Sequence, residues 1–207
     1  MPRTRRALLA VAMGLPILGF LLIAIAFWRL LPPVMPQRGQ NLPAAVREAL
    51  WLESKGVTWQ LARVHLGRLA SSGVLPRERE IAWHFRGLAL VSWLSLSWTR
   101  DEMVDAYGAV VWMGSHRFGL EAGARHFYGQ CVSELSPPRL AMVIAMVRAP
   151  RRLDPACHPE RALDARNAFL ARMSTASLLS ASEAATAMAE PLGVTVACEE
   201  RDNLSAG

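Results

Sequence analysis

The chain has 207 residues, 52% of them apolar, and a formal net charge of +6 that comes almost wholly from arginine. This length suits one domain plus a short additional segment. The basic composition is accompanied by no recognition motif for nucleic acid, so we expect no nucleic-acid partner. The cysteines lack C-x-x-C spacing and the histidines lack neighbouring ligands, so neither a metal site nor a cofactor is predicted.

A basic tip and a long apolar run form the N-terminus. Three arginines precede Ala7–Trp28, which carries no charged residue. As a helix this run would be about 33 Å long, enough for a hydrocarbon layer of ~30 Å. We predict one transmembrane helix within residues 1–31, with a cytoplasmic N-terminus and an exported domain. A cleaved signal peptide is the alternative, because Ala24-Ile25-Ala26 resembles a cleavage site.

The rest of the chain is predicted to be all-α. Residues 32–43 form a proline-rich linker, which we expect to hold the domain just off the bilayer. Residues 44–192 form the domain, and residues 193–207 form a tail. Apolar periodicity predicts helices over Leu42–Leu69 (broken near Gly56), Glu78–Ser97, Thr99 to about Val111, Leu120–Tyr128, Arg139–Val147, Glu160–Met173 and Ser180–Met188. No alternating strand pattern longer than four or five residues precedes the tail.

Several helix starts carry capping signals. Thr99 followed by Glu102 forms a capping box. Ser136 precedes two prolines that suit a first helical turn. Ser180 or Ser182 is expected to cap the last helix. In an oxidising compartment two of the three cysteines could pair, and we favour Cys131 with Cys157 because both fall within the packed domain.

A series of ordered blocks resembles a known family. The first block runs Trp98-Thr99-Arg100-Asp101-Glu102-Met103-Val104-Asp105-Ala106-Tyr107, and the second runs Phe118-Gly119-Leu120-Glu121. Further along, Arg148-Ala149-Pro150 and Arg166 with Met173 resemble closing elements. Together they resemble the C-terminal half of the glycosyltransferase family 51 domain. Its members are membrane-anchored enzymes that polymerise lipid II into peptidoglycan glycan strands.

The resemblance implies a fold, a location and partners. We expect a lysozyme-like helical glycosyltransferase domain preceded by one N-terminal transmembrane helix. The protein would be a single-pass protein of the bacterial inner membrane with its domain in the periplasm. Its partners would be membrane lipid, lipid II or a glycan strand, and cell-wall synthesis proteins.

The match weakens upstream, where that family carries most of its chemistry. The family's first block supplies a glutamate regarded as the general base, and Glu53 is the candidate for it here, followed by Gly56-Val57-Thr58-Trp59. The competing interpretation makes Glu53 a solvated surface acid beside Lys55. The family's Arg-Lys-x-x-Glu block falls at Trp83–Gly87, which contains Arg86 but no glutamate.

Two main functions follow. In the first, the chain is a degenerate family member that binds lipid II or the synthesis machinery. In the second, it is an active transglycosylase with Glu53 as general base. Arg86, Arg117 and Arg148 are the predicted substrate-binding residues, which would stabilise the pyrophosphate. Lytic cleavage of peptidoglycan is a third possibility, and it also requires an acid in a cleft.

Overall fold

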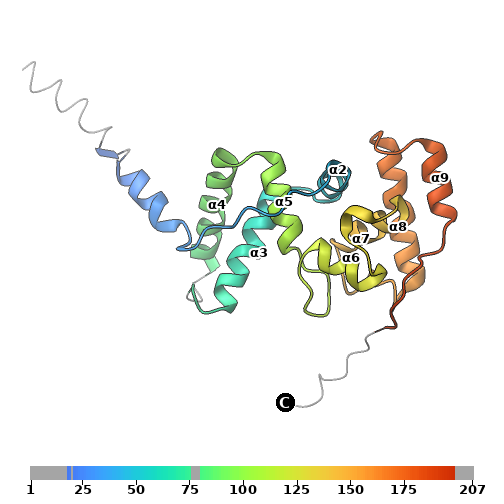
Figure 1. The fold of residues 1–207 in the computed structure, drawn as a ribbon. Coiled ribbons are helices and arrows are strands. Elements are labelled where there is room, and N and C mark those ends of the chain that lie inside the picture. The colour runs from blue at the N-terminus through green and yellow to red at the C-terminus, as the bar shows by residue number, and fades with distance from the viewer. Residues whose placement is uncertain (1–17, 20, 76–79, 199–207) are drawn as a thin grey trace, which may run out of the picture.

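The computed structural model describes residues 18–19, 21–75 and 80–198, and these residues form an all-helical fold (Figure 1). The elements are α2 (Ala44–Glu53), α3 (Val57–Ser71), α4 (Glu80–Ser97), α5 (Arg100–Val110), α6 (Leu120–Tyr128), the 3-10 turn η1 (Val132–Glu134), α7 (Pro137–Met146), α8 (Pro159–Thr175) and α9 (Ala181–Ala189). Within the described residues there is no strand, and Trp112 and Phe118 form an isolated antiparallel bridge. The all-α prediction is confirmed.

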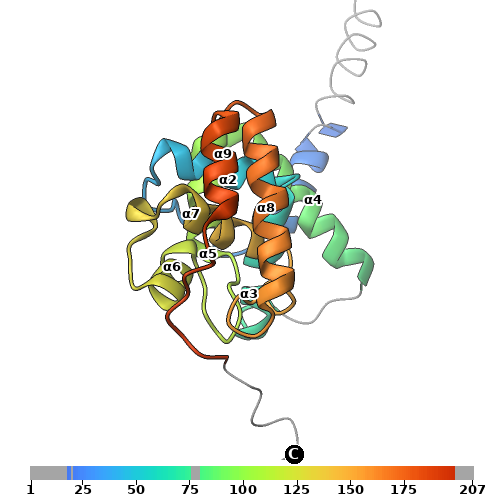
Figure 2. The same cartoon turned by 90° about the vertical axis from the view of Figure 1, so that its right-hand side faces the viewer.

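The helices form two groups joined by α2 and α5. On one side α3 packs against α4 and α5, and on the other α7 packs against α8, which in turn packs against α9. Helix α2 contacts both groups, through α5 on one side and α7 on the other. Figure 1 shows α3 and α4 at one end of the molecule and α8 and α9 at the other, and Figure 2 looks onto the α8–α9 end.

Helix α7 lies at the centre of the second group. The last seven residues of this helix, 140–146, are all buried. A helix that is apolar on every side requires partners all round, and α7 has them in α2, α6, α8 and α9. This helix therefore fixes the position of α2, and with it the end of α2 at Glu53.

The predicted capping signals are borne out. The Thr99 side chain accepts a hydrogen bond from the backbone N–H of Glu102, and the Glu102 carboxylate accepts one from the backbone N–H of Thr99. Ser180 forms the same reciprocal pair with Glu183 at the start of α9. Ser136 occupies the N-cap of α7 with a proline in the first turn, although its side chain makes no capping bond.

The N-terminal residues that the structure describes are helical over 21–30. The predicted span Ala7–Trp28 lies for the most part outside the described residues. In the part of the chain that the structure describes, no helix combines the length and the apolar character needed to cross a membrane.

The proline-rich segment lies directly on the domain. We call residues 31–43 the strap. The Val34 carbonyl lies 2.7 Å from Nε2 of His65 on α3, and the Leu42 N–H donates to Asp105 of α5 at 3.0 Å. Gly39 lies so close to α5 that a Cβ there would be 2.2 Å from the Asp105 carbonyl oxygen. The strap therefore joins the N-terminal helix to the domain through direct contacts with α3 and α5.

The cysteine pairing differs from the favoured one. Cys157 is bonded to Cys198, and Cys131 is a free thiol. The pairing follows from the path of the tail, in which the Thr195 N–H donates to the Phe127 carbonyl at 3.1 Å. This contact holds the tail against α6, and Cys198 then lies close enough to bond Cys157 in the segment before α8. The sequence argument was wrong because it treated the tail as lying outside the packed domain.

Candidate functional site

Glu53, the last residue of α2, lies in a cluster of charged side chains. Its side chain is only 2% exposed. One carboxylate oxygen accepts a hydrogen bond from Arg172 of α8, and the other lies 3.6 Å from Nε of Arg148. Arg172 also donates to the Leu52 carbonyl at 3.0 Å. The interpretation of Glu53 as a solvated surface acid is therefore wrong.

Tyr107 and Arg63 complete this cluster. The Tyr107 hydroxyl donates to Oε1 of Gln60. Burial raises the pKa of Tyr107 to about 12, an effect that Arg63 opposes and Glu53 adds to. The phenol therefore stays protonated near neutral pH and acts as a hydrogen-bond donor. We call Glu53, Arg63, Tyr107, Arg148 and Arg172 the Glu53 cluster.

The electrostatics of the Glu53 cluster favour an anion. Two guanidinium groups, those of Arg148 and Arg172, face one carboxylate, and Arg63 acts on the nearby Tyr107, so positive charge is in excess. Arg148 and Arg172 have side chains that are 59% and 40% exposed, so their remaining donors are open to solvent. Arginine binds phosphate and carboxylate groups through paired N–H donors. This arrangement suits binding of an anionic group at the surface above Glu53.

A groove of about 230 Å³ lies between α3 and α4. Its walls are mainly aromatic and apolar, and Arg63 belongs both to this groove and to the Glu53 cluster. The lining residues are Trp59, Ala62, Arg63, Leu66, Trp83, His84 and Gly87. Arg63 therefore links the groove to the Glu53 cluster.

Gly87 is the groove residue that stands where the resemblance places a second glutamate. A Cβ on Gly87 would lie 3.4 Å from Cη2 and 3.7 Å from Cζ3 of Trp59. The Trp59 ring thus covers the side of α4 from which a side chain at this position would project. Among the described residues that line the groove there is no carboxylate.

The predicted substrate-binding residues are placed in three different regions. Arg148 lies beside Glu53. Arg86 donates from Nη1 to the carbonyl oxygens of Leu30 and Leu31, at 3.3 and 3.4 Å, where the N-terminal helix ends. Arg117 lies in the loop between α5 and α6, where its N–H donates to the Gly114 carbonyl at 2.7 Å. Their roles in binding stay predictions.

Three members of the Glu53 cluster were not predicted as site residues, although one of them, Tyr107, lies in the first matched block. Arg172 reaches Glu53 from a position 119 residues away. A signal for it did exist, because Arg172 immediately precedes Met173, which belongs to the matched closing element. Arg63 carries no motif, and only the contact of α3 with α5 brings it near Tyr107. In the described ranges, no group of three or more acidic, histidine or cysteine side chains could hold a metal ion.

Comparisons with known proteins agree with this architecture. A family model described as transglycosylase matches residues 55–174. Penicillin-binding protein 1A of Streptococcus pneumoniae is 30% identical over 137 residues, which are 66% of this chain and 18% of that protein. Penicillin-binding protein 1A of Aquifex aeolicus is 31% identical over 127 residues, or 61% of this chain and 18% of that protein.

A solved structure shows the same fold. The crystal structure of penicillin-binding protein 1A from Haemophilus influenzae superposes with a TM-score of 0.51 at 18% identity, over 78% of this chain and 18% of that chain. This chain spans less than a fifth of the length of these relatives. Because the family model covers more than half of its residues, the chain belongs to the transglycosylase family, glycosyltransferase family 51.

Proposed function

We propose that the chain is a membrane-anchored, degenerate member of this family that binds lipid II without transferring its sugar. The pyrophosphate of lipid II would bind to the arginines of the Glu53 cluster. The run Ala7–Trp28 would anchor the protein in the bacterial inner membrane with its domain in the periplasm. The disulfide between Cys157 and Cys198 supports an oxidising compartment.

The observation that carries this proposal is the engagement of Glu53. A general base needs a carboxylate oxygen within hydrogen-bond reach of the hydroxyl that it deprotonates. Both oxygens of Glu53 instead face arginines, and the side chain is 2% exposed. In this arrangement Glu53 ties α2 to α8, and its carboxylate faces Arg148 and Arg172 and is screened from solvent.

Two further features support the loss of transfer activity. The family model begins at residue 55, after the only glutamate that could act as the base. The position of the second glutamate is Gly87, with the Trp59 ring across it. The cationic side chains of Arg63, Arg148 and Arg172 lie at the same site, which favours binding over chemistry.

An active transglycosylase is the second candidate. It is favoured by the exposure of Arg148 and Arg172, since Glu53 lies only one layer of side chains below the surface. A rotation of these two arginines toward a bound pyrophosphate would uncover the carboxylate. The same experiment separates the two functions.

The test combines a polymerisation assay and a binding assay on purified full-length protein with fluorescent lipid II in detergent. We expect no glycan strands from the wild type. Glu53→Gln should retain binding, because it removes negative charge from a site for an anion. Arg148→Gln should weaken binding by about fivefold to tenfold, the effect of losing one charge-assisted contact.

The matched control is Arg161→Gln, which removes an exposed arginine on α8 away from the Glu53 cluster. It should leave the affinity unchanged. Polymerisation by the wild type that disappears in Glu53→Gln would refute the proposal in favour of the active enzyme. Absence of lipid II binding by the wild type would refute both.

A further inference from the structure

A second basic surface forms where three segments meet at the loop between α5 and α6. The Arg68 guanidinium of α3 lies 4.5 Å from the centre of the Phe118 ring, and that of Arg151 lies 5.2 Å from the Trp112 ring. Trp112 and Phe118 pair through their backbones. With the exposed Arg152 they form what we call the Arg–aromatic surface.

The arginines of this surface are held in place but not neutralised. Among the described residues, no acidic side chain forms an ion pair with Arg68, Arg151 or Arg152. Stacking on an aromatic ring restricts a guanidinium while leaving its edge donors available. Less side-chain entropy is therefore lost when such an arginine binds an anion.

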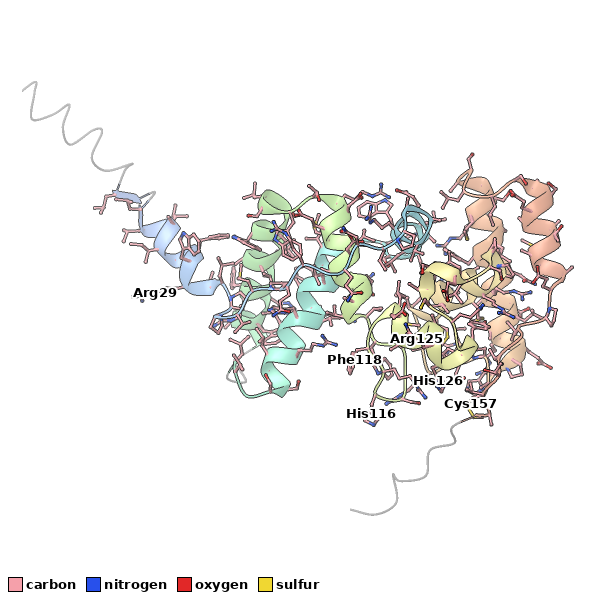
Figure 3. The ribbon with its side chains drawn as sticks, in the orientation of Figure 1. Arg29, His116, Phe118, Arg125, His126 and Cys157 are labelled. Atoms are coloured by element: carbon pink, nitrogen blue, oxygen red, sulfur yellow. A yellow bond between two sulfur atoms is a disulfide. The ribbon has the colours of Figure 1, made fainter. Side chains whose placement is uncertain are left out.

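The loop that carries Trp112 and Phe118 is backbone-strained. Ser115 and His116 both have left-handed φ values, 38° and 62°, which residues other than glycine rarely adopt. Hydrogen bonds hold this shape, from the Met113 N–H to the Arg117 carbonyl at 2.9 Å and from the Gly119 N–H to the Val111 carbonyl at 2.7 Å. Figure 3 shows His116 and Phe118 on this loop. Strain maintained in this way is typical of functional loops.

We propose that the Arg–aromatic surface binds a glycan strand through the carboxylates of its peptide stems. Guanidinium groups on two segments, α3 and the chain after α7, suit a polymer with repeated carboxylates better than a single small anion. Phe118 is 45% exposed and offers an apolar edge to sugar C–H groups. Arg151 follows Arg148 by three residues, so one strand could extend from the Glu53 cluster onto this surface.

This site is separate from the proposed lipid II site, because its ligand carries neither lipid nor pyrophosphate. The test is calorimetric titration of the full-length protein with soluble, uncrosslinked glycan strands that bear acidic peptide stems. The same strands with amidated carboxylates provide a neutral probe. A poly(glycerol phosphate) chain provides a polyanion that carries phosphate without amino sugars.

We expect the acidic strands to bind at least about tenfold more tightly than the amidated strands, as loss of several charge-assisted contacts requires. Arg68→Gln and Arg151→Gln should each weaken binding by about threefold to tenfold. Arg161→Gln, which removes an equal charge from α8, should have no effect. Arg152→Gln, which changes an exposed side chain, should weaken binding by a similar factor.

Three results would overturn the proposal. The first is equal affinity for acidic and amidated strands, or no binding of either. The second is an equal loss of affinity in Arg161→Gln, which would indicate attraction by overall charge alone. The third is tighter binding of poly(glycerol phosphate) than of the acidic strands, which would assign the surface to a phosphate polymer. Lipid II binding is measured separately, so its failure leaves this test unaffected.

Discussion

Replacing Gly39 by alanine should displace the strap from α5. The added methyl carbon would lie 2.2 Å from the carbonyl oxygen of Asp105, 2.4 Å from its carbonyl carbon and 2.7 Å from the Ala106 nitrogen. All three atoms belong to the backbone of a helix, so no side-chain rotation can relieve the contact. The strap must therefore move away from α5 at this point.

The expected loss in the free energy of unfolding follows from the contacts that this movement breaks. Overpacking of a close contact costs about 1–3 kcal/mol. A hydrogen bond to a charged group, such as that from the Leu42 N–H to Asp105, contributes about 1.5–3 kcal/mol. Because the two losses overlap, we expect Gly39→Ala to lower the free energy of unfolding by about 2–4 kcal/mol. For a chain of this size the Tm should fall by roughly 5–15 °C.

Gly67→Ala is the matched control. Gly67 lies within α3 and a Cβ there would have no atom within 4 Å. Alanine has the higher helix propensity, so this variant should gain about 1 kcal/mol. Differential scanning calorimetry of both variants measures the difference between their Tm values. A Gly39→Ala protein as stable as the wild type would refute the packing of the strap on α5.

Three other perturbations test separate parts of the fold. Burial lowers the pKa of His65 below 6.5, so the folded protein favours the neutral ring, which lies against the Val34 carbonyl. The contribution of His65 to the free energy of unfolding is therefore fully present above pH 6.5 and is lost as the pH falls below that value. Urea midpoints should therefore fall less between pH 7.5 and 5 in His65→Gln than in the wild type. Cys198→Ser should lower the free energy of unfolding by about 2–4 kcal/mol, and a reducing agent should then have no added effect on the Tm. Thr99→Ala should cost about 1 kcal/mol by removing the cap of α5, measured by urea denaturation, whereas an unchanged midpoint would contradict the capping box.

Local signals in the sequence predicted most of the helices. Thr99 with Glu102 and Ser180 with Glu183 define helix starts through contacts three residues apart, which a sequence displays directly. The helix Leu120–Tyr128 was predicted at its observed bounds, between two glycines with positive φ. Elements specified by neighbouring residues are therefore accessible to sequence reasoning.

The environment of Glu53 could not be predicted from neighbouring residues in the sequence. Its partner Arg172 lies on α8, and the two meet because α2 and α8 both pack on α7 and contact each other. The position of Arg86 was equally hidden, since its acceptors Leu30 and Leu31 belong to the segment predicted as the anchor. Both cases depend on which helices lie side by side, a property that no periodicity in a single segment specifies.

The bond between Cys157 and Cys198 encloses α8 and α9 in a covalent ring, since one cysteine precedes α8 and the other follows α9. An ordinary terminal helix frays from its free end, and its amides exchange with solvent through small local openings. In a closed ring that route is blocked, because neither end of the helical pair is free. We expect the α9 amides to exchange together with those of α8, as one cooperative unit whose protection collapses when the ring is opened by reduction.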